Sequence, residues 1–367
     1  MTGVADGKRV EQPVAAAMTM PDGVLRGHRH IRVTLLTLAL ALIVAMLLSL
    51  SLGRYAMPWN EVVHALWGSL VGDAGVAGSQ QHAVLFAVRI PRILMAVLAG
   101  AALAAAGAAY QGLFRNPLVS PDLLGVASGA GVGASLALLW SWPNIGVQAL
   151  AFGSGLLAVT LVLSLGSAVS RYSGGGVLVL VLAGIVVSSL CSAVTSLIKY
   201  LAPEDDKLPE ITFWLMGSLA RSGGWTNVYL LAGSLLLGGI PLLLLRWKLN
   251  VMTFGDDEAE AMGVDTRRVR LVVIVCATLI TATAVALCGV IGWVGLVIPH
   301  LCRFVVGPNY LALLPCSMLT GGLFLLVVDD VARTLTAGEI PLGVLTAIIG
   351  APVFIHLLFR GRRTWTT

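Results

Sequence analysis

Long apolar runs separated by short polar segments make up most of the chain beyond residue 32. Most of these runs approach the roughly 20 residues that an α-helix needs to cross a bilayer. The pattern therefore predicts an all-α, polytopic membrane protein with about ten transmembrane helices. The ten runs lie at about 33–52, 93–113, 123–140, 147–169, 177–200, 226–245, 271–290, 293–306, 311–332 and 341–359.

Three short or unusual segments modify this picture. The 123–140 run is rich in Gly, Ser and Ala, and the 293–306 run is shorter than a full span. Such segments favour burial within the protein over full contact with lipid. The apolar stretch 211–220 is shorter still, and we interpret it as a re-entrant or interfacial helix. The 33–52 run exceeds the length of a signal-peptide core and lacks a clear cleavage site, so it predicts an uncleaved first span.

The polar segments divide the rest of the chain. Residues 1–30 are predicted to form a polar N-terminal tail, residues 31–360 a ten-span membrane domain, and residues 361–367 a C-terminal tail. With the N-terminus placed inside, 16 of the 23 lysines and arginines fall in inside segments. This asymmetry predicts that both termini are cytoplasmic.

Composition agrees with a membrane location. Hydrophobic residues make up 57% of the chain and charged residues 11%, whereas soluble domains carry about 25% charged residues. The 42 glycines suit a bundle in which helix backbones approach closely. The net charge of +5 does not indicate nucleic-acid binding, because the basic residues lie in short loops between apolar runs.

The longest polar stretch within the body of the chain is residues 246–270. It begins with an acidic run, passes through Gly263 and ends with basic residues, an order that suits two short helices with a glycine C-cap between them. Charge alone leaves two interpretations open, a solvated cytoplasmic loop or a docking element for a cytoplasmic partner.

Among the basic residues on the predicted outer side, which run against the usual trend, three arginines stand beside the ends of spans. Arg89 and Arg92 share a face of the second span if they are helical, with Pro91 suiting the first helical turn. Arg333 follows Asp329 and Asp330 at the outer end of the ninth span. Interfacial snorkelling and local ion pairing with the aspartates are the simpler explanations. The alternative is a cationic patch for an acidic partner.

Several kinds of chemistry find no support. The chain has no G-x-x-x-x-G-K-[ST] phosphate loop, no H-E-x-x-H and no C-x-x-C among its five cysteines. We therefore expect no catalytic residues, no metal site and no cofactor. Ionisable residues near span centres are scarce, and proton- or sodium-coupled carriers usually need them. His300 and His356 are interpreted as packing or helix-end residues.

Several motifs together resemble the permease family of bacterial ferric-siderophore, haem and cobalamin ABC importers (FecCD-like, type II importer subunits). They stand in the family's order from about residue 31 to the C-terminus. They are R-I-P-R at 89–92, N-P-L at 116–118, G-L-V-I-P-H at 295–300, A-R at 332–333 and E-I-P-L-G-V-L-T-A at 339–347. The chain departs from the family at 308–310, where Pro-Asn-Tyr stands in place of Asp-His-Arg, and in its long polar N-terminus.

The resemblance implies a homodimer in the cytoplasmic membrane with a pathway along its two-fold axis. It also implies two cytoplasmic ABC ATPase subunits, which would hydrolyse ATP in place of this chain, and a periplasmic binding protein. Carried over residue by residue, it implies three sets of functional residues. Arg89, Arg92 and Arg333 would dock the binding protein; Asp257, Glu258, Ala259, Met262, Gly263 and Val264 would couple to the ATPase; and Asn116 and Leu118 would help close the cytoplasmic end of the pathway.

The expected function is thus a transmembrane permease subunit that carries a metal chelate. Three alternatives remain open at this point. The same fold imports oxyanions such as molybdate in some members. A secondary transporter would need mid-span carboxylates. A membrane enzyme would need a nucleophile and a base together, and Ser128 and His300 are the nearest residues of those types.

Overall fold

The structure is a computed structural model that describes residues 22–361 apart from 54, 56, 73, 174–176 and 337. Most of the predicted N-terminal tail and the predicted C-terminal tail beyond residue 361 lie outside the described residues. The described part is helical and contains no strand. The first helix begins earlier than its apolar run, at Asp22, and continues to Ser51.

Seven helices in the described ranges are long and apolar enough to cross a membrane. They are α1 (Asp22–Ser51), α4–η1–α5 (Gln80–Leu113), α7 (Asn144–Ser173), α8 (Val177–Leu201), α10 (Trp225–Leu244), α13 (Thr266–Cys288) and α15 (Tyr310–Thr334). Three apolar helices are shorter: α6 (Val126–Leu139), α14 (Val294–Val306) and α16 (Leu342–Gly361). The prediction of an all-α, polytopic chain is therefore confirmed, with ten as an approximate number of spans.

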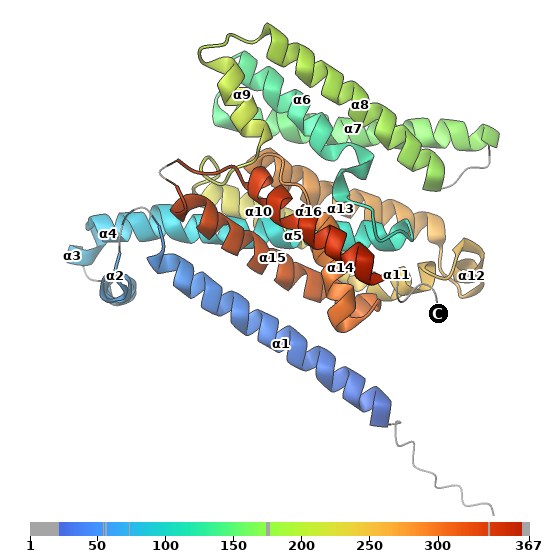
Figure 1. Cartoon of the computed structure of the whole chain (residues 1–367), viewed down its shortest axis with the longest axis horizontal. Coiled ribbons are helices and arrows are strands. Elements are labelled where there is room, and N and C mark those ends of the chain that lie inside the picture. The colour runs from blue at the N-terminus through green and yellow to red at the C-terminus, as the bar shows by residue number, and fades with distance from the viewer. Residues whose placement is uncertain are drawn as a thin grey trace, which may run out of the picture.

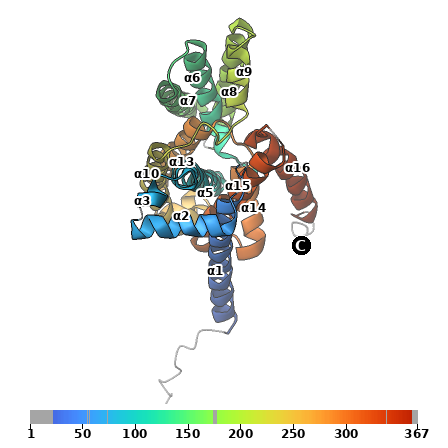
Figure 2. The same ribbon diagram turned by 90° about the vertical axis from the view of Figure 1, so that its left-hand side faces the viewer.

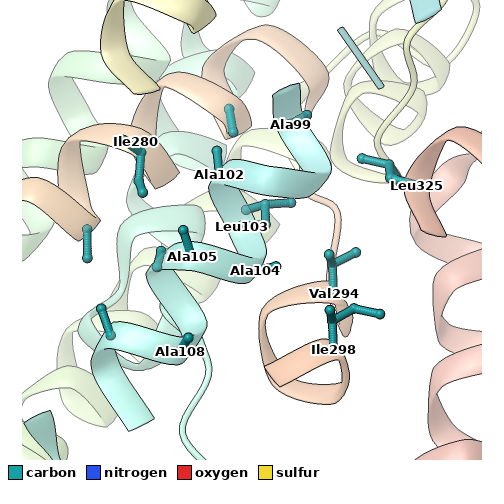
Figure 3. Close-up of a cluster of buried hydrophobic side chains, with 14 of the residues drawn as sticks. Ala99, Ala102, Leu103, Ala104, Ala105, Ala108, Ile280, Val294, Ile298 and Leu325 are labelled. Atoms are coloured by element: carbon teal, nitrogen blue, oxygen red, sulfur yellow. The ribbon is translucent and has the colours of Figure 1, made fainter. Parts of the chain in front are cut away.

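Helix α5 (Ile90–Leu113) forms the centre of the molecule, surrounded by α10, α13, α14 and α15. Its sequence is dominated by alanine, which favours helix and leaves little side chain at the contacts. Figure 3 shows how these alanines meet Ile280 of α13, Ile298 of α14 and Leu325 of α15.

Two glycine contacts bring neighbouring helices closest to α5. A Cβ on Gly100 would come closer than 3.0 Å to the backbone of Gly321 in α15, and a Cβ on Gly107 would do the same with Gly295 in α14. Only glycine allows such an approach, as is common in membrane bundles. The first contact sets the spacing between α5 and α15, and the second sets the spacing between α5 and α14.

The remaining helices form groups around this centre. Helices α6, α7, α8 and α9 (Lys207–Leu215) lie together on one side of α5, and α1 lies on the opposite side, packed against α15 (Figure 1). Helix α9 replaces the short apolar stretch predicted at 211–220 and begins four residues earlier.

The bundle has two distinct ends. One carries α2 (Trp59–Val71), α3 (Ala74–Ala77), α4 (Gln80–Ala83) and the π-helical turn η1 (Val84–Arg89), and we call it the α2 end. The other carries α11 (Arg246–Met252) and α12 (Asp256–Ala261), and we call it the α12 end (Figure 1). The sequence pattern did not predict α2, α3 or α4, because their apolar residues are interrupted by polar ones and their runs are short.

Candidate functional site

Arg89 lies at the α2 end, in the last turn of η1, and is only 4% exposed. Its guanidinium donates to the backbone carbonyl oxygens of Leu50 and Tyr55. These bonds tie the beginning of α5 to the last turn of α1 and to the segment that follows it. The predicted docking residue is thus an internal connector in this structure.

Arg92 makes two forked ion pairs one turn further along α5. Its Nε and Nη2 donate to the Asp329 carboxylate at 2.9 and 2.8 Å, and its Nη1 and Nη2 donate to Glu339 at 2.9 and 3.0 Å. Asp329 belongs to α15 and is 1% exposed. Such bidentate pairs are strong and geometrically specific, so Arg92 joins α5 to α15 and to the loop before α16.

Arg333 connects α15 to α1. It pairs with Asp330 one turn earlier and approaches Asp329 at 3.8 Å. It also donates to the carbonyl oxygens of Leu52, at 2.9 Å, and Ser49, at 3.1 Å. The i,i+3 and i,i+4 ion pairs that the sequence left as an explanation of Arg333 are therefore present.

Together these groups form a charge-balanced cluster of three arginines and three carboxylates, in which Arg92 and Arg333 make the ion pairs. We call it the arginine cluster; its members are Arg89, Arg92, Arg333, Asp329, Asp330 and Glu339. The three arginines and Glu339 also line one open cavity of about 270 Å³, beside Gly53 and Tyr55. The docking role of the three arginines stays a prediction.

Sequence reasoning found the arginines but missed most of their partners. Glu339 lies 247 positions from Arg92, and the backbone oxygens of Leu50 and Tyr55 carry no sequence signal. Gly53 gave no signal either. Its φ of +144° is a backbone conformation that favours glycine, and a Cβ there would also lie 3.2 Å from guanidinium nitrogens of both Arg89 and Arg333.

The α12 end holds the predicted coupling segment. Helix α12 ends in a Schellman motif, with Gly263 at φ +80° and Val264 N–H donating to the Ala259 carbonyl at 2.9 Å. The structure divides the predicted residues into two groups. Ala259 and Val264 are buried and anchor the loop, whereas the other four are exposed: Asp257, Glu258, Met262 and Gly263.

Polar contacts fix α12 against the start of α13. Arg270 donates to Asp256 at 2.8 Å, and Thr266 donates to Glu260 at 2.9 Å. Asp265 caps α13 by accepting from the Arg268 N–H at 3.0 Å. These contacts hold α12 against α13 and so fix the position of the exposed side of α12.

The predicted gate residues lie in the turn after α5, which also belongs to the α12 end. Asn116 Oδ1 accepts from the Leu118 N–H at 2.9 Å, an Asx turn. Arg115, just before it, has φ +50°. Gln111, at the end of α5, donates to the Val119 carbonyl oxygen beyond the turn and to the Leu296 carbonyl oxygen of α14, and so joins the turn to both helices. Asn116 and Leu118 are both exposed.

Asn250 of α11 links the coupling segment to α15. Its Nδ2 donates to Asn309 Oδ1 at 2.8 Å, and its Oδ1 accepts from the Tyr310 N–H at 2.8 Å. Asn309 also caps α15. Asn116, Asn250 and Asn309 line one cavity of about 690 Å³. Residues 308–310, where the chain departs from the family pattern, thus hold the coupling segment in place.

The predicted packing role of His300 agrees with its surroundings. Its ring meets Phe304 and Phe354 edge to face, with centroids 5.4 and 6.1 Å apart. Ser128, on α6, is not among the residues that line its cavity. The structure gives no support for pairing these two residues in an enzyme.

A bundle whose described part has seven helices that are long and apolar enough to cross a membrane is that of an integral membrane protein. The model of the FecCD transport family matches residues 41–360. The chain is 41% identical to a molybdate import system permease of Haemophilus influenzae, over 89% of this chain and 95% of that protein. It is also 41% identical to an iron chelatin transport system permease of Helicobacter pylori, over 76% and 83% of the two chains.

The solved structures include an inward-facing conformation of an ABC transporter of the metal-chelate type. It is 40% identical to this chain, with a TM-score of 0.78, and the match covers 89% of this chain and 98% of that one. The chain belongs to the FecCD transport family. It is an integral membrane permease subunit of an ABC transporter, so its role is in transport and not in catalysis.

Proposed function

We propose that the chain forms the membrane passage of an importer for a metal chelate, such as a ferric siderophore, haem or cobalamin. Two findings support this choice of cargo. The solved transporter with 40% identity is of the metal-chelate type, and the Helicobacter pylori relative is described as a permease for iron chelatin. The first of these comparisons carries the most weight, because it covers nearly the whole of both chains.

The proposed assembly is a homodimer with two cytoplasmic ABC ATPase subunits and a periplasmic binding protein that delivers the cargo. The α12 end would face the cytoplasm, as the loop charges predict. The exposed residues Asp257, Glu258, Met262 and Gly263 would then meet the ATPase. The Asn116 turn would close the passage on the same side.

In the proposed mechanism, ATP binding closes the ATPase pair and moves α12. Because Arg270 and Thr266 tie α12 to α13, movement of α12 shifts the start of that helix as well. Asn250 passes the same movement to α15. ATP can drive transport only by favouring one arrangement of the helices over another, by a few kcal/mol.

Docking of the binding protein is proposed to use the cavity beside the arginine cluster. Charge reversal of Arg92 would break its internal ion pairs, and charge reversal of Arg89 would break its hydrogen bonds to backbone carbonyls, so the test changes the mouth of the cavity instead. Tyr55→Glu places a negative charge there, and Tyr55→Phe is the matched control. In liposomes with the ATPase, we expect Tyr55→Glu to weaken stimulation by the binding protein and Tyr55→Phe to retain it. Equal stimulation of both variants would contradict the docking role.

An oxyanion is the second candidate cargo, because the Haemophilus influenzae relative is a molybdate permease. Uptake into ATP-loaded liposomes distinguishes the two. With the cognate binding protein present, radioactive ferric siderophore, haem or cobalamin is supplied in one set and molybdate in the other. Accumulation of a chelate supports the first proposal, and accumulation of molybdate alone replaces it. If neither enters and no ATPase purifies with the chain, the importer assignment itself is in conflict with the result.

A further inference from the structure

Helix α2 has one face that packs on the protein. Val62, Ala65 and Gly68 are buried, and a Cβ on Gly68 would come closer than 3.0 Å to Val76 of α3. This face therefore rests on α3, and the opposite side of α2 points away from the described part of the bundle.

The outward side of α2 is apolar and uncovered. Trp59, Val63, Trp67 and Leu70 follow at i, i+4, i+8 and i+11, which places them on one face of the helix. Trp67 is 66% exposed and Leu70 is 80% exposed. A stripe of large apolar side chains with this exposure marks a binding surface in a stable protein.

A third face of α2 is polar. Asn60, Glu61 and His64 lie between the buried and apolar faces and line an open cavity of about 630 Å³. Ser79 and Gln81, from the segment that begins α4, line its other wall. The helix thus meets protein on one side, carries apolar side chains on the second and has a polar, water-accessible third side.

The orientation of α2 fits a membrane surface. The helix is viewed along its axis in Figure 1 and along its length in Figure 2, where it lies across the end of α1. Helix α1 is a candidate span with little of its surface buried, and Leu36, Leu40 and Val44 form an exposed stripe along it. A span with such a stripe is suited to contact with lipid, and α2 then lies near the level at which that span leaves the bilayer.

We propose that α2 is an interfacial helix that binds the surface of the phospholipid bilayer at the α2 end of the bundle. Its tryptophan face lies at the boundary between headgroups and acyl chains, and its polar face meets water. Tryptophan is enriched at this depth because its ring is amphipathic, and helices with such faces lie in the plane of the interface. The occupant is lipid, because α2 lies across the end of α1 (Figure 2), a candidate span with little of its surface buried, and its tryptophan face is uncovered there.

This placement has a consequence for the arginine cluster. The chain between α1 and α2 carries Gly53 and Tyr55, which line the cavity beside the guanidiniums. A helix held on the lipid surface would fix the direction in which that segment leaves α1. The inference does not depend on the cargo or on which side of the membrane the α2 end faces.

The test compares two neighbouring positions on different faces of α2. Val63→Cys and His64→Cys are spin-labelled separately, in a variant whose five cysteines are alanine and whose ATPase stimulation is intact. The full transporter is reconstituted in phosphatidylcholine vesicles. Collisions with oxygen report lipid, and collisions with a water-soluble nickel chelate report water. We expect the ratio of oxygen to nickel collisions to be several-fold higher for the Val63→Cys label.

Two results would overturn the proposal. Equal and high nickel accessibility at both positions would place α2 in water. A Val63→Cys label inaccessible to both reagents would show that protein covers this face, either a second copy or another subunit. Fluorescence quenching by brominated lipid gives an independent measurement. Trp59→Phe/Trp67→Phe should lower the quenched fraction, whereas Trp214→Phe, which removes a buried tryptophan, should not lower it; an equal decrease in both variants contradicts lipid contact.

Discussion

Replacing Arg92 by methionine tests whether the arginine cluster holds the α2 end together. The variant keeps the length of the apolar stem and removes the guanidinium. It leaves Asp329, which is 1% exposed, with only Arg333 at 3.8 Å as its remaining ion-pair partner. Breaking a buried ion pair by removing one partner costs about 3–5 kcal/mol. We expect the lower end, about 3 kcal/mol, because Glu339 is partly exposed and can regain water.

The matched control is Arg268→Met at the α12 end. Arg268 pairs with Asp265 at 2.9 Å, but its side chain is 87% exposed. Exposed ion pairs contribute about 0–1 kcal/mol. The midpoint of thermal unfolding of the purified transporter in detergent is the measurement. We expect a large decrease for Arg92→Met and almost none for Arg268→Met.

A double variant separates the ion pair from simple packing. In Arg92→Met/Asp329→Leu the buried carboxylate is removed together with its partner. Because an apolar pair of similar volume is often neutral relative to a buried ion pair, the double variant should unfold at a higher temperature than Arg92→Met alone. The reasoning is refuted if Arg92→Met unfolds at the same temperature as the control.

Three further predictions concern the helix contacts and the α12 end. Gly107→Ala should destabilise the transporter by about 1–3 kcal/mol through overpacking, whereas Gly153→Ala, where a Cβ meets nothing within 4 Å, should be neutral or slightly stabilising in thermal unfolding. Asn250→Ala removes the hydrogen bonds that join α11 to α15, so limited proteolysis should cut the 246–270 segment faster. Met262→Glu should reduce co-purification of the ATPase without lowering the unfolding midpoint, whereas Ala259→Glu should lower both; equal effects would contradict the division of this loop into surface and anchor.

The spans could be predicted from the sequence because lipid leaves few choices. A run such as 271–290 must satisfy its backbone hydrogen bonds internally, so helix is the only solution for an isolated span. The structure places α13 at Thr266–Cys288, within a few residues of that prediction. Helix α2 is not a span and carries no continuous apolar run. It was missed because Asn60, Glu61 and His64 interrupt its apolar pattern.

The functional residues were harder to predict than the spans. A motif names residue types, but burial and partners depend on contacts between distant segments. Arg92 meets Glu339 only because α15 and the following loop fold back onto α5. Ala259 and Met262 look equally plausible as surface residues in the sequence, yet the Schellman turn buries the first and exposes the second.

The arrangement of α5 and α15 offers a direct connection between the two ends of the molecule. At the α2 end the helices are joined by Arg92 and Asp329, and at the centre by the backbone contact of Gly100 with Gly321. At the α12 end, Tyr310 at the start of α15 is bound to Asn250 of the coupling segment. No side chain separates the two backbones at the glycine contact, so the two helices pack directly on each other. If docking at the arginine cluster and ATP binding at α12 act as proposed, both would act on this same pair of helices.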